Sequence, residues 1–387
     1  MAKTQPAPEA AESTTPSPAP APVTEAEPEP EVSSAGITMP AAGDIKVALL
    51  VPTSGRHAGL GQAMVNAAQM ALFDSADERF GLLVRDTGGT ATGAQAALRA
   101  ALREGAGLIL GPIFAGSTRA IAQEARAAGV NIISFSNDRS IAGEGLYVMG
   151  LSPADQVERV VAYASQQGLR RFAAVAPANA YGQLVIAAMG ESARRQGGQV
   201  TRTVLFSPSG ADASNEVRSL APASGYDAVM LPMGGKTLLT VAPLLPYYDI
   251  DPGAVRFLGT ALWDDTRLGT EPALQGGWFA APPPNLWRSF KDRYQALYGA
   301  QPPRLATLAY DATALASVLA GRAVTAGSER VFESEGLTQP SGFSGVDGIF
   351  RFRPDGVAQR GLAVLEMQRG SFRVLSPAPR SFQDLTS

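Results

Sequence analysis

The sequence of 387 residues contains no cysteine and a single histidine, His57. Without cysteine there are no disulfide bonds, no thiol catalysis and no zinc sites built from cysteine and histidine. No run of about 18 apolar residues is present, which is the length that a membrane-spanning helix requires. Lysine and arginine are not gathered in a basic stripe, so the charge pattern does not favour nucleic-acid binding. The composition thus excludes cysteine chemistry, and we expect no cofactor and no metal.

The first residues, Met1–Pro6, also lack the apolar core of a signal peptide. This leaves two alternatives: a cytosolic protein, or an exported protein whose signal has been removed.

Residues 1–43 are rich in proline, alanine and glutamate and have hardly a large apolar side chain. Such a segment cannot bury enough surface to offset the entropy cost of ordering it, and its prolines favour an extended chain. Two interpretations stay open: a disordered tail, or a tether between an anchor and a folded body.

From Asp44 onward, apolar runs alternate with segments of helical spacing. Ile45–Val51 reads as a buried parallel strand, and a polar loop and a helix over 59–76 follow it. The same unit recurs, with further strands expected at 80–85, 107–110, 131–135, 171–176, 200–206, 226–231, 255–259 and 277–281. Strands that alternate with helices predict an α/β fold of doubly wound, mainly parallel sheets. A division near residue 153 predicts two such lobes.

Prolines 282–284 interrupt this alternation. Two helices without strands of their own are expected at 285–298 and 305–321, so the chain must return to the first lobe there. Alternating runs around tight turns over 348–375 predict an antiparallel meander. We therefore expect residues 44–153 and 282–342 in lobe 1, and residues 154–281 and 343–387 in lobe 2.

Motifs for enzymes are incomplete or absent. Gly234-Gly235-Lys236 follows a strand, but the phosphate-binding loop needs a glycine where Met230 stands. No G-x-G-x-x-G follows a strand, and no G-x-S-x-G occurs. His57 has neither an acid nor a nucleophile motif as a partner, so it is either a ligand donor or a solvated loop residue. The sequence predicts a protein that is not an enzyme.

Polar residues gather where the expected strands end, which is where ligands bind in α/β sheets. They are Ser54, Ser117, Thr118, Ser136, Asn137, Tyr181 and Lys236, with His57 beside them. Phe114 and Ala115 belong to the same strand–loop–helix stretch as Ser117. Each residue alone is a typical cap or turn former, but together they predict a cleft between two lobes for a small polar ligand. Trp263 would line this cleft or belong to the core.

From Asp44 to about Leu375 the chain resembles type I periplasmic binding proteins of the leucine/isoleucine/valine-binding family. The matching motifs are Pro52-Thr-Ser-Gly55, Gly111-Pro112 with Ser117-Thr118, Tyr181-Gly182, Tyr310-Asp311-Ala312, and Gly348–Phe352 with Asp355-Gly356. The resemblance implies two Rossmann-like lobes joined by three crossovers.

For an amino-acid ligand, the resemblance implies that Ser117 and backbone groups bind the carboxylate and that Tyr181 lines the cleft. Two departures stand out. Ala115 replaces a serine of the family's loop, and no carboxylate lies near 233–236, where the ammonium partner is expected. Lys236 would repel an ammonium group.

Three further stretches, Leu110–Phe114, Ile133–Arg139 and Val157–Val161, resemble a subgroup of this fold, the penicillin-binding protein activators. These are outer-membrane lipoproteins that stimulate peptidoglycan synthases by direct contact. The resemblance implies a periplasmic, non-enzymatic activator with a penicillin-binding protein as its partner. It also implies a tether to an N-terminal lipid anchor, although the lipid-bearing cysteine is absent from this sequence.

The alternative is the substrate-binding subunit of an ABC importer for branched-chain or related amino acids, with an ABC permease as partner. A third reading is an amide sensor in the same fold.

Overall fold

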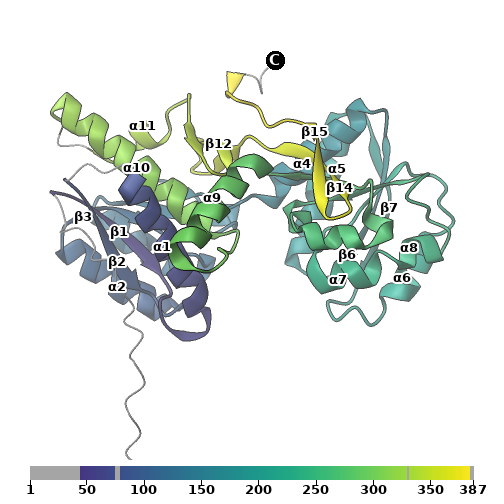
Figure 1. Cartoon of the computed structure of the whole chain (residues 1–387), viewed down its shortest axis with the longest axis horizontal. Coiled ribbons are helices and arrows are strands. Elements are labelled where there is room, and N and C mark those ends of the chain that lie inside the picture. Colours follow the sequence, from purple (N-terminus) through teal and green to yellow (C-terminus); the bar gives the residue numbers. More distant parts are fainter. Residues whose placement is uncertain (1–43, 75–78, 329–330, 384–387) are drawn as a thin grey trace, which may run out of the picture. The chain divides into compact units, whose positions relative to one another are not determined.

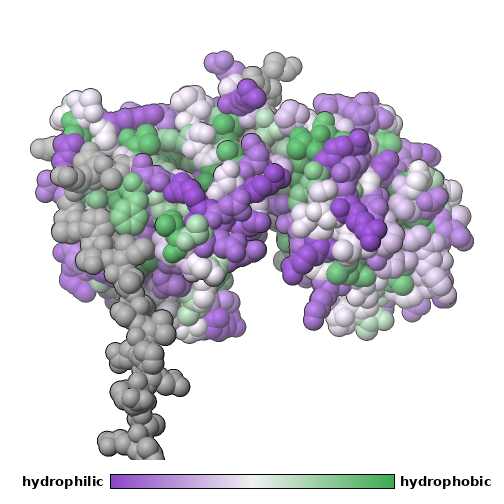
Figure 2. All heavy atoms as spheres, viewed as in Figure 1, coloured by the Kyte–Doolittle hydropathy of each residue, from purple (hydrophilic) through white to green (hydrophobic). Residues whose placement is uncertain are grey.

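The computed structural model describes residues 44–74, 79–328 and 331–383, and the expected tether at 1–43 lies outside them. Figure 1 shows the chain as a mixed α/β structure in which helices flank the sheets. None of the helices in the described ranges is both long enough and apolar enough to cross a membrane. On the face drawn in Figure 2, hydrophilic and hydrophobic residues are interspersed.

The first lobe is built on a parallel sheet in the order β2-β1-β3-β4-β5. Its strands are β1 (Ile45–Val51), β2 (Phe80–Asp86), β3 (Ala106–Leu110), β4 (Asn131–Ser134) and β5 (Leu146–Val148). Residues 47–51 are wholly buried, because helices cover both faces of the sheet. The near-continuous apolar run is thereby explained.

Two groups of helices cover this sheet. The first alternates with the strands: η1 (Gly55–His57), α1 (Ala58–Asp74), α2 (Ala91–Arg103), α3 (Ala115–Ala127) and η2 (Arg139–Ile141). The second comes from far along the chain: α9 (Pro284–Tyr298), α10 (Ala306–Ala326) and α11 (Ser334–Leu337). Helix α10 lies along α1 (Figure 1), so the chain packs against the first lobe again after Pro284.

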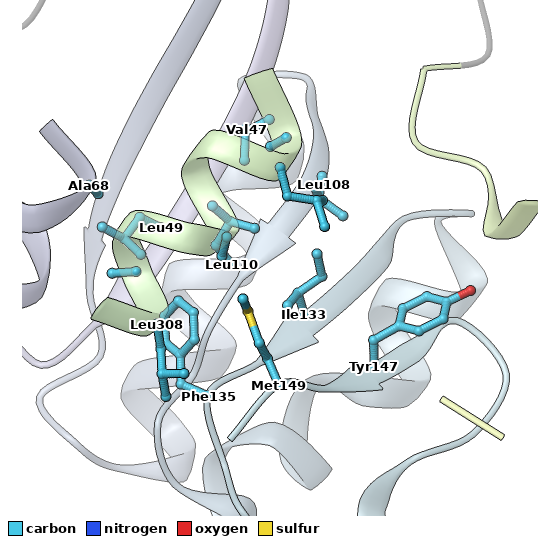
Figure 3. Close-up of a cluster of buried hydrophobic side chains, with 14 of the residues drawn as sticks. Val47, Leu49, Ala68, Leu108, Leu110, Ile133, Phe135, Tyr147, Met149 and Leu308 are labelled. Carbon is cyan, nitrogen blue, oxygen red and sulfur yellow. The ribbon is translucent and has the colours of Figure 1, made fainter. Parts of the chain in front are cut away.

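The side chains between the sheet and α10 form the main core of the first lobe. Figure 3 shows Leu49 and Leu110 beside the helix that carries Leu308, with Ile133 on β4 and Met149 directly after β5. All five are almost completely removed from solvent. Burying such side chains stabilises the fold by about 1.5–3 kcal/mol each.

The second lobe contains a seven-stranded sheet in the order β15-β14-β10-β9-β8-β6-β7. Strands β6 to β10 are parallel, and β14 joins β10 in antiparallel fashion. The strands are β6 (Arg171–Pro177), β7 (Gln199–Phe206), β8 (Ala228–Met230), β9 (Arg256–Gly259), β10 (Trp278–Ala281), β14 (Ala363–Gln368) and β15 (Ser371–Ser376). Its helices are α4 (Pro153–Gln166), α5 (Ala180–Arg195), α6 (Ala213–Leu220), α7 (Gly235–Val241), α8 (Leu244–Tyr247), η3 (Ala261–Trp263), η4 (Thr266–Thr270) and η5 (Pro272–Leu274).

The expected meander divides between two sheets. Strands β11 (Phe343–Gly345), β12 (Gly348–Phe352) and β13 (Ala358–Arg360) form a separate antiparallel sheet. Phe350, Phe352 and Ala358 lie in the same core cluster as Leu49, so residues 343–360 pack on the first lobe. This differs from the expected assignment of all residues after 342 to the second lobe, because burial of these aromatic side chains rather than chain order decides where the strands lie.

Three crossovers connect the lobes. The chain passes from β5 to α4, from β10 to α9, and from β13 to β14. This is the architecture of two lobes and three crossovers that the family resemblance implies.

Candidate functional site

The first loop of the candidate site, after β1, is held by a carboxylate that the sequence analysis did not single out. Asp86, at the end of β2, accepts hydrogen bonds from the backbone N–H groups of Thr53 (2.8 Å), Ser54 (3.2 Å) and Gly88 (2.8 Å), and from the Ser54 hydroxyl (2.5 Å). Burial alone would raise the pKa of Asp86, but these hydrogen bonds outweigh it and hold the pKa below its usual value. The sequence pattern that could have identified Asp86 is an aspartate at a strand end that is followed closely by glycines.

His57 and Phe114 form an aromatic pair next to this loop. Their ring centroids are 4.8 Å apart, and a Cβ added to Gly89, which has φ of +70°, would lie 3.4 Å from both rings. His57 Nε2 accepts a hydrogen bond from Arg56 Nε (2.8 Å). The first lobe thus brings Ser54, His57 and Phe114 together, with His57 packed as an aromatic surface.

Helix α3 begins directly after Phe114, whose side chain does not cap it. The N–H groups in the first turn, starting at Ala115, therefore have no side-chain acceptor from the cap position. Ser117 lies in that turn and is 3% exposed. Its hydroxyl makes no hydrogen bond within the part of the chain that the structure describes. A hydroxyl without a protein partner, beside free N–H groups, can donate a hydrogen bond to a carboxylate.

Thr118 and Ser136 have internal partners instead. The Thr118 hydroxyl bonds the Phe114 carbonyl oxygen (3.2 Å) and the Ser134 hydroxyl (2.8 Å). The Ser134 hydroxyl also accepts from the Ser136 N–H (3.2 Å), and the Ser136 hydroxyl accepts from a backbone N–H (3.1 Å). These side chains tie the start of α3 to the end of β4, whereas Asn137 is exposed.

In the second lobe, Tyr181 lies in the first turn of α5. Its hydroxyl is 2.9 Å from the Thr260 hydroxyl, which follows β9. Burial raises the pKa of Tyr181, and the hydrogen bond with Thr260 offsets part of that rise. The phenol is therefore neutral at physiological pH and can act only as a hydrogen-bond donor or acceptor.

Trp263 and Lys236 have opposite environments. Trp263 is completely buried, and its Nε1–H donates to the carbonyl oxygens of Leu231 (3.2 Å) and Met233 (3.1 Å). Of the two roles that the sequence left open, wall or core, the structure shows Trp263 in the core. It holds in place the loop that leads to Lys236, which is exposed at the start of α7.

The acidic residues of the second lobe nearest to Trp263 are already paired. Asp264 bonds Arg304 Nε (3.1 Å), and Asp265 forms an ion pair with Arg267 (2.7 Å). Arg304 is another residue that sequence reasoning missed, because no motif marks it. In the described ranges, no hydrogen bond or ion pair joins the first-lobe candidates to Tyr181 or Lys236.

Two further observations bear on what else the fold could bind. A hollow of about 1000 Å³ lies at the amino ends of the first-lobe strands, lined by Asp44, Lys46, Gly107, Asn131 and Phe332 among others. None of the predicted site residues lines it. No group of three or more metal-binding side chains occurs among the residues that the structure describes.

Comparisons with known proteins agree with the fold. The sequence matches the periplasmic binding protein family over residues 44–371. In structure, the chain is similar to a proposed branched-chain amino acid ABC transporter of Rhodospirillum rubrum (TM-score 0.74, 22% identity, 86% of this chain and 99% of that chain). It is also similar to a branched-chain amino acid ABC transporter periplasmic ligand-binding protein of Burkholderia xenovorans (TM-score 0.70, 19% identity, 86% and 94%).

A third similar structure is an ABC transporter solute-binding protein of Rhodopseudomonas palustris in complex with 3,4-dihydroxybenzoic acid (TM-score 0.64, 16% identity, 86% and 96%). In sequence, the chain is 24% identical over 178 residues to an uncharacterized protein of Rickettsia prowazekii, which is 46% of this chain and 47% of that protein. That match spans about half the length of the curated relative. With a family match that covers most of its length and the two-lobe fold described above, the chain belongs to the periplasmic binding protein family and has the type I fold of its leucine/isoleucine/valine-binding members.

Proposed function

We propose that this protein is the solute-binding subunit of an ABC importer and that it binds a small carboxylate-bearing solute between its lobes. The family consists of periplasmic ligand-binding proteins rather than enzymes, and the similar structures named above are described as ABC transporter proteins. A periplasmic location follows from the same proposal, with an ABC permease as the partner. The tether and lipid anchor expected from residues 1–43 are outside the described residues.

The observation that carries the proposal is Ser117. Its side chain is almost fully buried in the uncapped first turn of α3, and its hydroxyl has no partner in the described ranges. Because no protein group occupies this hydroxyl, a ligand carboxylate that accepts a hydrogen bond from it gains affinity. The adjacent aromatic pair of His57 and Phe114 offers an apolar surface for the remainder of the solute. In this proposal Ser54, Ala115, Thr118, Ser136 and Asn137 shape the first-lobe side of the site.

The charges on the second lobe favour a solute without an ammonium group. Asp264 and Asp265 are engaged by Arg304 and Arg267, so neither is free to pair with an ammonium. Lys236 is exposed and cationic near the same strand ends, and it would attract a carboxylate and repel an amine. We therefore expect an organic acid to bind more tightly than the amino acid of the same shape.

The sequence analysis favoured an activator of penicillin-binding proteins, and we now rank this function below solute binding. The names of the similar structures support transport, and no feature of the described residues marks a surface for a peptidoglycan synthase. The activator role stays a prediction.

Calorimetric titration and thermal unfolding with a matched pair of solutes test the proposal. Leucine and 4-methylpentanoate differ only by the ammonium group, and benzoate adds an aromatic acid. A site filled at about 100 times its Kd adds about 2.7 kcal/mol to the free energy of unfolding. Binding of 4-methylpentanoate or benzoate in preference to leucine is the expected result. Tighter binding of leucine would contradict the charge argument, and no binding of any of the three would overturn this choice of solute class.

A serine variant tests the site itself. Ser117→Ala removes one hydrogen bond to a charged group, worth about 1.5–3 kcal/mol, and should weaken solute binding about tenfold or more. Ser289→Ala, on the exposed part of α9, is the matched control and should leave the Kd unchanged. Equal affinities of the two variants would remove Ser117 from the site.

A further inference from the structure

A buried cluster of charged side chains lies where the connections between the lobes pass. Arg304, just before α10, approaches Asp264 of the second lobe (Nε to Oδ2, 3.1 Å) and Asp347 between β11 and β12 (Nη1 to Oδ1, 2.7 Å). The exposed fractions of the side chains are 22% for Arg304, 9% for Asp264 and 0% for Asp347. The guanidinium therefore bridges one carboxylate from each side of the lobe junction.

The cluster continues through two more ionisable residues, Asp311 and Arg360. Asp347 also accepts a hydrogen bond from the Thr307 hydroxyl (2.7 Å). Its backbone N–H faces Asp311 (3.4 Å), and Arg360 Nη1 lies 4.0 Å from an Asp311 carboxylate oxygen. Three carboxylates and two guanidinium groups thus share one largely buried region.

These residues lie next to all three crossovers. Arg360 is the last residue of β13, directly before the third crossover, and it donates to the Met149 carbonyl oxygen (3.0 Å) at the first. Arg304 lies over the ring of Trp287, 4.5 Å from its centroid, just after the second crossover. Any movement of one lobe relative to the other must therefore act on this cluster.

We propose that Arg304 is a positioning residue, whose ion pair with Asp264 couples the second lobe to the cluster at the crossovers. This ion pair sets the relative populations of the arrangements of the two lobes, and through them the affinity for solute. The effect on affinity rests on the proposed function, whereas the effect on lobe arrangement does not.

The physical reason is the cost of separating buried charges. An ion pair that has lost most of its water gains more from mutual attraction than one at the surface, and leaving one partner buried and unpaired is unfavourable. An arrangement of the lobes that keeps Arg304 against Asp264 is favoured over one that separates them. Because solute binding selects among arrangements, a change in that balance changes the apparent Kd.

Asp264→Asn is the most informative change. It removes one charge without altering the size of the side chain, and Arg304 keeps Asp347 as a partner, so no guanidinium is left without a carboxylate. Asp265→Asn is a matched control, because the neighbouring Asp265 forms its ion pair with Arg267 of the same lobe. Asp264→Glu retains the charge and should behave as the wild type.

The lobe arrangement is measured with two spin labels. Because the chain has no cysteine, the changes Gln123→Cys on α3 and Glu191→Cys on α5 place one label on an exposed helical residue of each lobe. Pulsed electron spin resonance then gives the distribution of distances between them without solute. We expect Asp264→Asn to broaden or shift this distribution, while Asp265→Asn and Asp264→Glu reproduce that of the wild type.

Calorimetric titration with 4-methylpentanoate and benzoate supplies the second readout, and Asp264→Asn should change the Kd at least fivefold relative to Asp265→Asn. Identical distance distributions in the two asparagine variants would overturn the proposal. A changed distribution with equal Kd values would overturn the link to affinity. If the wild type binds neither solute, the proposed choice of solute fails while the distance measurement still decides the role of Arg304.

Discussion

The titration of Asp311 gives the sharpest prediction about stability. Asp311 lies on α10 and is wholly buried. Burial and the nearby charge of Asp347 raise the pKa of Asp311 to about 7, against the opposing effects of Arg360 and of the N–H groups of Val346 and Asp347. Asp311 is thus protonated in the folded protein at a pH where it is ionised in the unfolded chain.

The sign of the effect follows from the protons bound in each state. Below the unfolded pKa of 3.8 both states hold the proton, and above about pH 7 neither does. Between these values the folded state binds more protons, so the free energy of unfolding falls as the pH rises. A difference of about 3 pH units at about 1.4 kcal/mol each gives an upper bound of about 4 kcal/mol for the stability lost across this window.

The perturbation is Asp311→Asn, which removes the titrating group and retains an acceptor for the Val346 N–H. Urea unfolding of wild type and variant is measured from pH 4.5 to 8.5, and the two lobes are followed separately if their transitions differ. The stability of the wild type relative to the variant should fall by about 3 kcal/mol over this range, because the measurement starts above the unfolded pKa. A constant offset between the proteins does not affect this result, because only the slope is compared.

Asp265→Asn is the control for the slope. The hydrogen bond with Arg267 lowers the pKa of Asp265, so its contribution to stability is present above the unfolded pKa and is lost only as the pH falls below about 4. Between pH 5 and 8 this variant should run parallel to the wild type. If Asp311→Asn also runs parallel, Asp311 is ionised throughout and the reasoning is refuted.

Two further predictions concern packing and the first loop. A Cβ on Gly259 would lie 2.3 Å from the ring of Trp263, so Gly259→Ala should destabilise the second lobe by about 1–3 kcal/mol or more. Gly59 on α1 faces open space, so the control variant Gly59→Ala should stabilise the protein by about 0.5–1 kcal/mol. Thermal unfolding of the two variants and the wild type measures both effects. Asp86→Ala leaves the N–H groups of the first loop without their acceptor and should cost about 1–3 kcal/mol. It should also weaken solute binding in calorimetry, and an unchanged Kd would separate this loop from the site.

Local patterns predicted most of the fold. The alternation of apolar runs and helical spacing fixed the order of strands and helices, because parallel strands covered on both faces must be apolar throughout. The return of the chain to the first lobe after Pro284 was predicted because two expected helices had no strands of their own to cover. The placement of β11 to β13 did not follow, because whether Phe350 and Phe352 are buried in one lobe or the other depends on tertiary packing.

The candidate site, like the fold, was predictable from the sequence only in part. The loops at the strand ends were predictable, since the carboxyl edge of a parallel sheet is a consequence of topology. The roles of the side chains within them were not. Thr118 and Ser117 are neighbours of similar chemistry, yet one hydroxyl is bonded to Ser134 and the other has no partner in the described ranges. Only the position of β4 relative to α3 distinguishes them.

The charged cluster at the crossovers shows most clearly why some contacts cannot be predicted from the sequence. Asp264, Arg304 and Asp347 are about 40 residues apart in sequence and belong to no motif, so each alone reads as a surface charge. Their pairing arises because the chain crosses between lobes three times and brings the ends of the second-lobe sheet, α10 and the small antiparallel sheet to one place. The crossovers that bring these charges together are also the segments that any movement of one lobe relative to the other would bend. Separating the buried charges and changing the arrangement of the lobes would therefore involve the same residues.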